Sequence, residues 1–350
     1  MRYFAPLILV LSFVTPAKAQ LWAFASVDRL NRHLAGQVVD YTYNHGKDNR
    51  IFSNALQKPR DAYVYLPPNY DPNKRYPLLL YFHFVRVDEQ EFIGSRQLIR
   101  LDRMIQAGEF PPTVVVCPDG TISGRNHITE RTSFYVNGVK GRFEDHIITE
   151  LIPFVMSRYS IRPEREAHAI MGISSGGFGA LSLAIRYRSF FGAVATLAAP
   201  ANLLYDTCHH NPLEDFQPET YRWKTCYDPN EIIGRFYLGL LRVKAKYFIE
   251  PVFGKPPEDV DARIAAVNPA SLIESTNLQP GELAIYLNYA EWDGYNIDAQ
   301  NKSFAWLASQ RGVAVTLEEA RHAGHNLRYF QSNHRPAFAW LQQHLLPPSP

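Results

Sequence analysis

One short stretch constrains this 350-residue chain more than any other: Gly172-Ile173-Ser174-Ser175-Gly176, with a serine midway between two glycines. An apolar run at 167–173 precedes it and predicts a buried strand, and apolar residues at helical spacing follow it. A serine on a sharp strand-to-helix turn has strained backbone angles, and the two glycines remove the clash that bulky neighbours would cause. The turn would lift the Ser174 hydroxyl above the sheet and aim the Ser175 N–H at an oxyanion beside it. The same spacing also occurs by chance in turns without chemistry, so its meaning depends on the rest of the chain.

The remaining sequence alternates short apolar runs with amphipathic segments, a pattern that predicts strands alternating with helices. We expect strands at 62–66, 78–82, 113–117, 167–173, 193–198, 282–287 and 313–317. We expect helices at 95–107, at 143–159 with a kink at Pro153, after Ser174, at 299–310 and at 334–345. This order predicts an α/β fold with a mostly parallel central sheet and helices on both faces. Ligands of such folds bind beyond the C-terminal ends of the strands, where Ser174 falls.

The regular order is interrupted between about residues 203 and 275, where prolines, histidines and aromatic residues dominate. We interpret this segment as an insertion over the active-site end of the sheet, within a single domain at 20–350. Its aromatic side chains favour either an acyl or aromatic-lined pocket or a small core of the insertion's own.

The expected partners of Ser174 lie in the C-terminal part of the chain. A serine hydroxyl needs a base to take its proton, and a third group must hold that base in one tautomer. In folds with this turn the partners follow in the order serine, acid, histidine. His325 is the expected base, because it stands in a small-residue loop after the last predicted strand, and His322 is the reserve. Asp293, next to a turn glycine, is the first choice for the acid, and Glu291 is the second.

Two backbone N–H groups are expected to hold the oxyanion. The first belongs to Ser175, and the second to Phe84 or Val85 in the loop after the strand at 78–82. The other C-terminal histidines, His334 and His344, are expected on a terminal surface helix.

The composition excludes several other classes of function. The 36 basic and 34 acidic residues are scattered without long runs, so nothing in the overall charge indicates a nucleic-acid partner or an anionic membrane. One polar cluster, Cys208, His209, His210 and Asp215, could hold a metal, but adjacent histidines rarely converge on one ion. We expect no metal and no cofactor, and the sequence leaves the oligomeric state open.

The N-terminus has the pattern of a secretory signal peptide: Arg2, an apolar run at 4–14, and small residues before Ala19. We therefore expect a signal peptide at 1–19 and a secreted or periplasmic protein. The apolar run is too short to span a bilayer, so no transmembrane anchor is expected in the mature chain. In an exported protein Cys208 and Cys226 could close a short disulfide loop, whereas Cys117 is expected to be a buried free thiol.

Taken together, these motifs resemble the putative-esterase group of the α/β-hydrolases, which includes S-formylglutathione hydrolase, feruloyl and enterochelin esterases, and secreted mycolyltransferases. The resemblance runs from about Ala62 to the C-terminus. It rests on Gly172-Ile173-Ser174-Ser175-Gly176-Gly177, on Ser133-Phe134-Tyr135 followed by Glu150-Leu151-Ile152-Pro153, and on Gly324-His325-Asn326.

The resemblance implies an α/β-hydrolase fold with Ser174 as nucleophile, His325 as base, Asp293 as acid and Ser175 as oxyanion donor. Two positions depart from the group's pattern. Phe84 follows His83 where the group usually has a glycine, and Ala290 stands where the group usually has the glycine of Gly-x-x-Asp.

The function that follows is cleavage of a carboxylic ester through an acyl-enzyme on Ser174, with a small-molecule or glycan-linked ester as substrate. Two alternatives remain open: an acyltransferase that uses the same three residues, and a catalytically inactive homologue that binds a ligand. A serine that reacts with acyl or phosphonate reagents would separate the inactive homologue from the other two.

Overall fold

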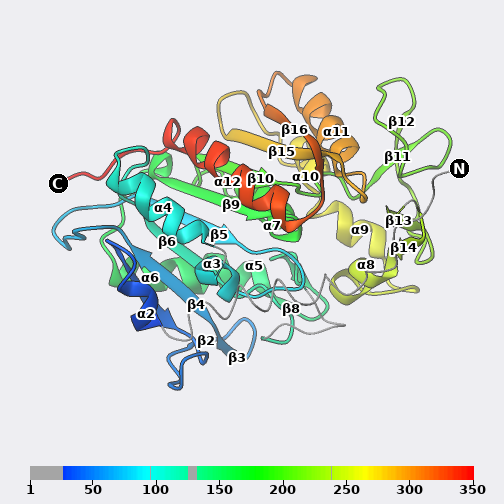
Figure 1. Ribbon diagram of the computed structural model, residues 1–350. Helices are drawn as coiled ribbons and strands as arrows, with labels where there is room; N and C mark the ends of the chain where they lie inside the picture. The colour runs from blue at the N-terminus through cyan, green and yellow to red at the C-terminus, as the bar shows by residue number, and fades with distance from the viewer. Residues whose placement is uncertain (1–26, 95, 125–131, 238) are drawn as a thin grey trace, which may run out of the picture.

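The computed structural model describes residues 27–94, 96–124, 132–237 and 239–350 (Figure 1). The expected signal peptide lies outside these residues. Within them, no helix combines the length and the apolar character needed to cross a membrane.

An eight-stranded sheet forms the centre of the molecule, in the order β1-β4-β6-β5-β9-β10-β15-β16 (Figure 1). Its strands are β1 (Gln37–Tyr41), β4 (Ala62–Leu66), β5 (Leu78–Phe82), β6 (Val114–Pro118), β9 (His168–Ile173), β10 (Ala193–Leu197), β15 (Ala284–Trp292) and β16 (Thr316–Gly324). The six strands from β6 to β16 in this order run parallel, and β4 pairs antiparallel with both of its neighbours. The mostly parallel sheet expected from the sequence is confirmed.

Helices cover both faces of the sheet. One face carries α2 (Val27–Asn31), α3 (Gln90–Gly94), α4 (Gln97–Gln106) and α12 (Leu327–Gln342). The core of the other face includes side chains of α6 (Ile152–Arg158), α7 (Ser175–Arg186), α10 (Pro269–Ser275) and α11 (Ile297–Ser309). Small elements complete the framework: β2 (Ile51–Ser53), β3 (Lys58–Arg60), β7 (Asn137–Gly138), β8 (Gly141–Arg142), α5 (Phe143–Asp145) and η2 (Arg165–Ala167).

Strand β4 shows why the sequence produces two separate core layers. Successive side chains of a strand point to opposite faces of the sheet. Ala62, Val64 and Leu66 accordingly lie in the core beside α6 and α7, whereas Tyr63 and Tyr65 lie in the core beside α4 and α12. All five side chains are buried, as a strand covered on both faces requires.

The segment between β10 and β15 contains most of the region interpreted above as an insertion. It forms the hairpin of β11 (Tyr205–Thr207) and β12 (Tyr221–Trp223), the hairpin of β13 (Ile232–Phe236) and β14 (Leu241–Lys244), and helices α8 (Lys246–Phe253) and α9 (Val260–Ala265). Side chains of α8 and α9 share an apolar cluster with Phe134 and with Phe178 of α7.

Several boundaries near the C-terminus differ from expectation. Strand β15 extends five residues beyond Leu287, and β16 ends at Gly324 rather than at Leu317. Helix α12 begins at Leu327 rather than at His334, because the Asn326 side chain accepts a hydrogen bond from the Tyr329 N–H at 3.1 Å and so caps the first turn.

The helical segment at 143–158 is irregular where a proline interrupts its hydrogen bonds. A π-helical stretch, η1 (His146–Leu151), separates α5 from α6, and Pro153 stands in the first turn of α6. Proline has no N–H to donate to the preceding turn, and wider π turns re-route hydrogen bonds at such interruptions. The irregularity therefore lies before Pro153, as a change of helix type.

The possible disulfide between Cys208 and Cys226 is not formed, and both thiols are free and exposed. The β11–β12 hairpin explains this outcome. The Cys208 N–H bonds to the Thr220 carbonyl. The Lys224 N–H, close to Cys226, bonds to the Leu204 carbonyl. The two hydrogen bonds therefore lie four residues apart along the hairpin. Four residues of strand span about 13 Å, which is more than a disulfide can bridge. Cys117 is buried and free, as expected.

The expectation that His334 lies on the surface is wrong, because its ring is buried between α12 and β5. Its Nδ1–H donates to the Phe330 carbonyl at 2.6 Å, and its Nε2 accepts from the Tyr81 hydroxyl at 2.8 Å. Burial lowers the pKa of His334 to about 4. The hydrogen bond to the Phe330 carbonyl opposes this shift, whereas the charge of Arg100 adds to it. The imidazole is therefore neutral at pH 7.

This burial predicts that acid weakens the fold. The pKa of His334 is 6.5 in the unfolded chain and about 4 in the native chain, so between these values only the unfolded chain binds a proton. The free energy of unfolding is therefore full above pH 6.5 and decreases as the pH falls toward 4. The loss should approach about 3 kcal/mol of unfolding free energy. In His334→Gln, chemical denaturation should show a smaller decline across this range, whereas His344→Gln, at a half-buried position, should keep the wild-type decline. Equal declines in all three proteins would contradict this origin of acid sensitivity.

Candidate active site

The turn between β9 and α7 holds Ser174 in a strained conformation. Its backbone angles are φ 51° and ψ −119°, which a residue with a side chain rarely adopts. The flanking glycines permit the close packing that sustains them. A Cβ at Gly172 would lie 2.2 Å from the Gly176 carbonyl oxygen, and a Cβ at Gly176 would lie 2.4 Å from the carbonyl oxygen of His83. The glycine spacing is therefore a packing requirement of this turn.

Three side chains that are far apart in the sequence form one hydrogen-bonded chain at this turn. The Ser174 Oγ lies 3.0 Å from His325 Nε2, and His325 Nδ1 lies 2.7 Å from Asp293 Oδ2. Each residue directly follows a parallel strand: β9, β16 and β15. The structure thus brings together the serine, histidine and acid that the sequence singled out. Because an ionised carboxylate only accepts hydrogen bonds, His325 carries its proton on Nδ1 and leaves Nε2 free to accept from the serine.

Packing fixes the orientation of the histidine and the carboxylate. The His325 ring stands edge-on to the rings of Tyr295 and Phe330, with centroids 5.2 Å away in both cases. The Asp293 side chain is fully buried, and its second oxygen accepts the Tyr295 N–H at 2.9 Å. Both carboxylate oxygens are therefore occupied, and the imidazole has little room to rotate.

His322 and Glu291, the second choices for base and acid, pair with each other. Glu291 Oε2 accepts the backbone N–H of His322 at 2.6 Å and lies 3.6 Å from its ring Nδ1. The His322 side chain is 77% exposed, whereas that of His325 is 11% exposed. Exposure and pairing thus separate His322 and Glu291 from the hydrogen-bonded chain at Ser174.

A cavity opens above Ser174, and its volume is about 970 Å³ when the solvent-filled mouth is included. Ser174, Ser175, Val85 and His325 form part of its wall. Most of the remaining wall comes from the segment between β10 and β15, including Leu203, Leu204, Ile233, Phe248, Ile249 and Ile264. An ion pair between Lys224 and Glu231 adds a polar element to this mainly apolar lining.

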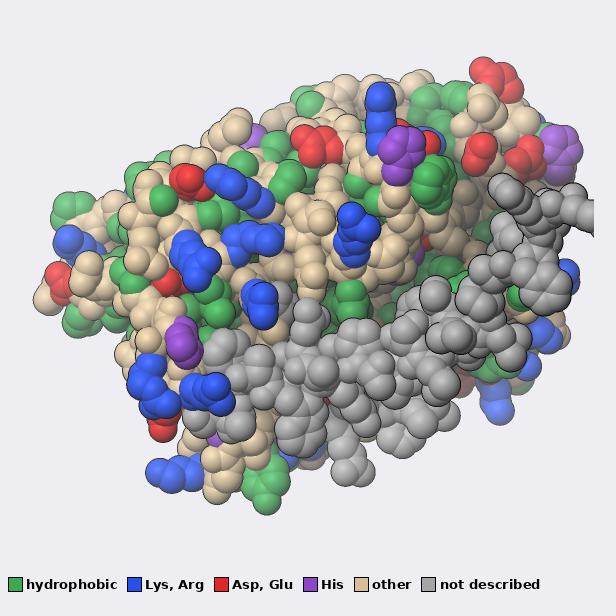
Figure 2. Space-filling model, viewed as in Figure 1, with side chains coloured by type: hydrophobic (Ala, Val, Ile, Leu, Met, Phe, Trp, Pro, Cys, Tyr) green, Lys and Arg blue, Asp and Glu red, His purple; other side chains and the backbone are tan. Residues whose placement is uncertain are grey.

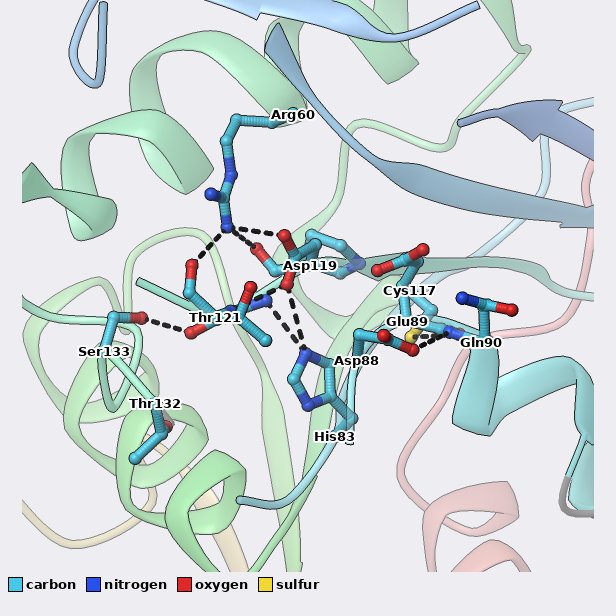
Figure 3. A network of polar contacts seen from close by, with 12 residues as sticks. Arg60, His83, Asp88, Glu89, Gln90, Cys117, Asp119, Thr121, Thr132 and Ser133 are labelled. Carbon is cyan, nitrogen blue, oxygen red and sulfur yellow. Dashed lines mark hydrogen bonds and ion pairs between the residues drawn. The ribbon is translucent and has the colours of Figure 1, made fainter. Parts of the chain in front are cut away.

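A buried polar network, drawn in Figure 3, holds the loop that follows β5. His83 Nδ1 donates to the Phe84 carbonyl at 3.0 Å, and His83 Nε2 accepts the Gly120 N–H at 2.9 Å. Asp119 lies beside this ring, with Oδ1 at 3.8 Å from Nε2, and its other oxygen pairs with Arg60 Nη2 at 2.8 Å.

This network sets the direction of a second backbone donor. In a trans peptide the carbonyl and the following N–H point in opposite directions. Because His83 holds the Phe84 carbonyl, the Val85 N–H points away from His83, and Val85 lines the cavity together with Ser174 and Ser175. Ser175 is the first residue of α7, so its own N–H has no acceptor within the helix. The Phe84 ring packs against Phe330 at 5.1 Å.

Several buried carboxyl groups surround this network. Burial would raise the pKa of Asp119, but the charge of Arg60 outweighs it and lowers the pKa to about 2. Burial raises the pKa of Asp61 to about 6, and burial together with Asp88 raises the pKa of Glu89 well above its ordinary value. Asp119 is therefore the ionised partner of Arg60, and Glu89 is held toward its neutral form.

Neither this network nor the aromatic pair around His325 was predicted from the sequence. Arg60 ends β3, whereas His83 follows β5 and Asp119 follows β6, and no spacing rule connects the three residues. In the sequence, Pro118-Asp119-Gly120 indicates only a turn. The one available signal was the position of Asp119 immediately after β6, at the sheet edge where Ser174 also lies.

A model of the Putative esterase family matches residues 53–345, which is most of the chain. The chain belongs to this family. The match includes Ser174, Asp293 and His325, as well as the loop after β5.

The match to an individual relative covers a shorter stretch of the chain. Esterase Rv1288 from Mycobacterium tuberculosis (strain ATCC 25618 / H37Rv) is 31% identical over 153 residues, which cover 41% of this chain and 30% of that protein. The alignment thus spans less than a third of the length of this relative.

Solved structures share the fold over nearly the whole chain. An S-formylglutathione hydrolase from Agrobacterium tumefaciens has a TM-score of 0.63 at 15% identity, covering 89% of this chain and 97% of that chain. A ferulic acid esterase has a TM-score of 0.61 at 18% identity, covering 89% of this chain and 100% of that chain. At these identities the likeness concerns the fold, which is that of the α/β-hydrolases.

The contact between Gly176 and the loop after β5 generates a prediction. In Gly176→Ala the new methyl would lie 2.4 Å from the His83 carbonyl oxygen and 2.5 Å from that of Phe82, so it would push the loop and the Val85 N–H outward. We expect the turnover number for an aryl ester to fall about a hundredfold, as when one oxyanion donor is removed. The free energy of unfolding should fall by about 1–3 kcal/mol.

Gly281→Ala is the control, because nothing lies within 4 Å of its Cβ position and its φ of 78° imposes backbone strain alone. It should lower stability without changing turnover. Full turnover in Gly176→Ala would show that the loop position is unimportant.

Proposed function

We propose that the protein is an exported serine hydrolase that cleaves carboxylic esters through an acyl-enzyme on Ser174. The observation that carries this proposal is the continuous chain from the Ser174 hydroxyl through His325 to the buried Asp293, at the wall of a largely apolar cavity. Membership of the Putative esterase family supports the same class of reaction.

In the first half-reaction, Ser174 Oγ attacks the ester carbonyl carbon while His325 Nε2 takes the hydroxyl proton. The N–H groups of Ser175 and Val85 hold the negative oxygen of the tetrahedral intermediate. When the intermediate collapses, the carbon–oxygen bond to the alcohol breaks, and His325 returns the proton to the departing alkoxide. The acyl group remains on Ser174.

In the second half-reaction, water attacks the acyl carbon and His325 takes one of its protons. Collapse of the second intermediate frees the carboxylic acid and returns the proton to Ser174 Oγ. Asp293 keeps the imidazole in the required tautomer and stabilises the imidazolium formed in each half-reaction, and its complete burial strengthens this interaction.

For the substrate, we propose a small-molecule or glycan-linked ester whose acyl group is hydrophobic or aromatic. The side chains of Leu203, Ile233 and Phe248 offer an apolar wall to such a group. A structural neighbour described as a ferulic acid esterase is consistent with an aromatic acyl group, although the similarity is one of fold.

The catalytic proposal is tested with a fluorophosphonate probe and a short-chain aryl ester. The wild-type protein should be labelled and should hydrolyse the ester, and Ser174→Ala should do neither, because no other group can form the covalent bond. A folded wild-type protein that is not labelled would instead favour the ligand-binding homologue.

A matched pair of variants identifies the acid. Asp293→Asn should lower the turnover number by about four orders of magnitude, since an amide favours the wrong imidazole tautomer. Glu291→Gln should retain turnover, because Glu291 contacts His322 rather than His325. The reverse pattern would make Glu291 the acid.

Export is tested separately from catalysis. The N-terminal pattern of Arg2, an apolar run and Ala17-Lys18-Ala19 predicts that the protein leaves the cytoplasm and begins at Gln20. N-terminal sequencing of the protein recovered from the medium or periplasm should give Gln-Leu-Trp. Ala19→Pro should leave the precursor uncleaved, and a full-length cytoplasmic product from the wild-type sequence would contradict export.

A further inference from the structure

The β13–β14 hairpin presents large apolar side chains to solvent at its tip. Leu240 is 90% exposed, and Tyr237 and Leu241 beside it are about half exposed. Tyr247, in the first turn of α8, is exposed as well. Exposed apolar residues gathered in this way mark a surface that contacts a protein partner or a membrane.

Directly behind this tip, two arginines face each other across the hairpin. Arg235 and Arg242 are opposite one another in the antiparallel register, and both are exposed. Like charges directly opposite in a strand pair destabilise the pair. Over the described part of the chain, neither arginine makes an ion pair. An anionic partner would relieve this repulsion.

The positive charge extends along the whole hairpin. Residues 232–249 contain four basic side chains, Arg235, Arg242, Lys244 and Lys246, and no aspartate or glutamate. Glu231, just before this segment, is already paired with Lys224. Figure 2 shows several blue side chains at the right-hand edge of the molecule, the side on which Figure 1 labels β13 and β14. The balanced charge of the whole chain conceals this local excess.

The spacing between the apolar tip and the arginines matches the depth of a membrane interface. Arg235 lies two residues before Tyr237, and Arg242 lies two residues after Leu240, so both arginines lie about 7 Å behind the tip. Amphipathic interfacial segments bury their apolar face about 5–10 Å into the boundary between headgroups and acyl chains. We propose that the β13–β14 hairpin docks the protein on an anionic lipid bilayer, with Leu240 and Leu241 among the acyl chains and the arginines at the lipid phosphates.

Other occupants fit this surface less well. A second copy of the chain would bring two pairs of arginines together around the tip. A nucleic acid would satisfy the arginines but would leave Leu240 without an apolar contact. An anionic bilayer satisfies both kinds of side chain at once.

Docking would place the bilayer on elements that also line the cavity. Ile233 of β13 and Phe248 of α8 line the cavity wall, and the Phe236 ring contacts Tyr295 at 4.8 Å. The inference concerns binding alone and does not depend on turnover.

The test is co-sedimentation with vesicles of phosphatidylcholine alone and of phosphatidylcholine mixed with phosphatidylglycerol. Wild-type protein and Ser174→Ala should both bind the anionic vesicles at least about tenfold more tightly, and high salt should weaken this preference. The double variant Leu240→Asp/Leu241→Asp should lose binding at least about tenfold. It should still hydrolyse a soluble aryl ester at the wild-type rate, which shows that it is folded.

Two further variants make the test specific. Arg235→Gln/Arg242→Gln should lose the preference for anionic vesicles, and Phe52→Asp, at an exposed apolar position on the β2–β3 hairpin, should bind like the wild type. Equal binding to both vesicle types, or unchanged binding by the double aspartate variant, would overturn the proposal. A concentration-dependent dimer that the aspartates abolish, without vesicle binding, would assign the hairpin to a second copy instead.

Discussion

The close contact between the turn at Ser174 and the end of β5 is the constraint on which the site depends. The serine occupies a conformation that costs about 1–3 kcal/mol, so surrounding contacts must hold it there. The Ser174 N–H is anchored to the Leu197 carbonyl of β10 at 2.8 Å, and glycine at position 176 lets the first turn of α7 touch the carbonyls of Phe82 and His83. Two N–H donors from distant parts of the chain therefore reach one cavity wall.

A second requirement is that the loop after β5 keeps its shape without regular secondary structure. The loop is stabilised by buried polar groups: the Gly120 N–H, next to the ion pair of Arg60 and Asp119, donates to His83, which in turn holds the Phe84 carbonyl. Phe84, which departs from the glycine usual in the group, does not disturb this arrangement because its ring packs against Phe330 of α12. The same Phe330 contacts His325, so the loop and the histidine are positioned by a common side chain.

The features that were predicted well from the sequence depend on patterns among neighbouring residues. The spacing around Ser174, the alternation in β4 and the apolar run of β5 each depend on residues close in sequence, and the fold class followed from their order. Features that depend on pairing between distant segments were missed. His334 was placed on the surface because the pattern of α12 does not reveal that Tyr81 lies opposite it. The hairpin register that separates Cys208 from Cys226 is likewise invisible in their spacing.

The β13–β14 hairpin and the loop that holds Asp293 share a backbone hydrogen bond, from the Arg235 N–H to the Gly294 carbonyl at 2.7 Å. A Cβ at Gly294 would lie 2.5 Å from the Phe236 ring, so the two segments are in close contact immediately after Asp293. The β13–β14 hairpin therefore both lines the cavity and holds the loop of Asp293 in place. Sequence changes that adapt this hairpin to a different ligand must keep its contact with Gly294. Variation is therefore confined to the side of the hairpin that faces away from Asp293.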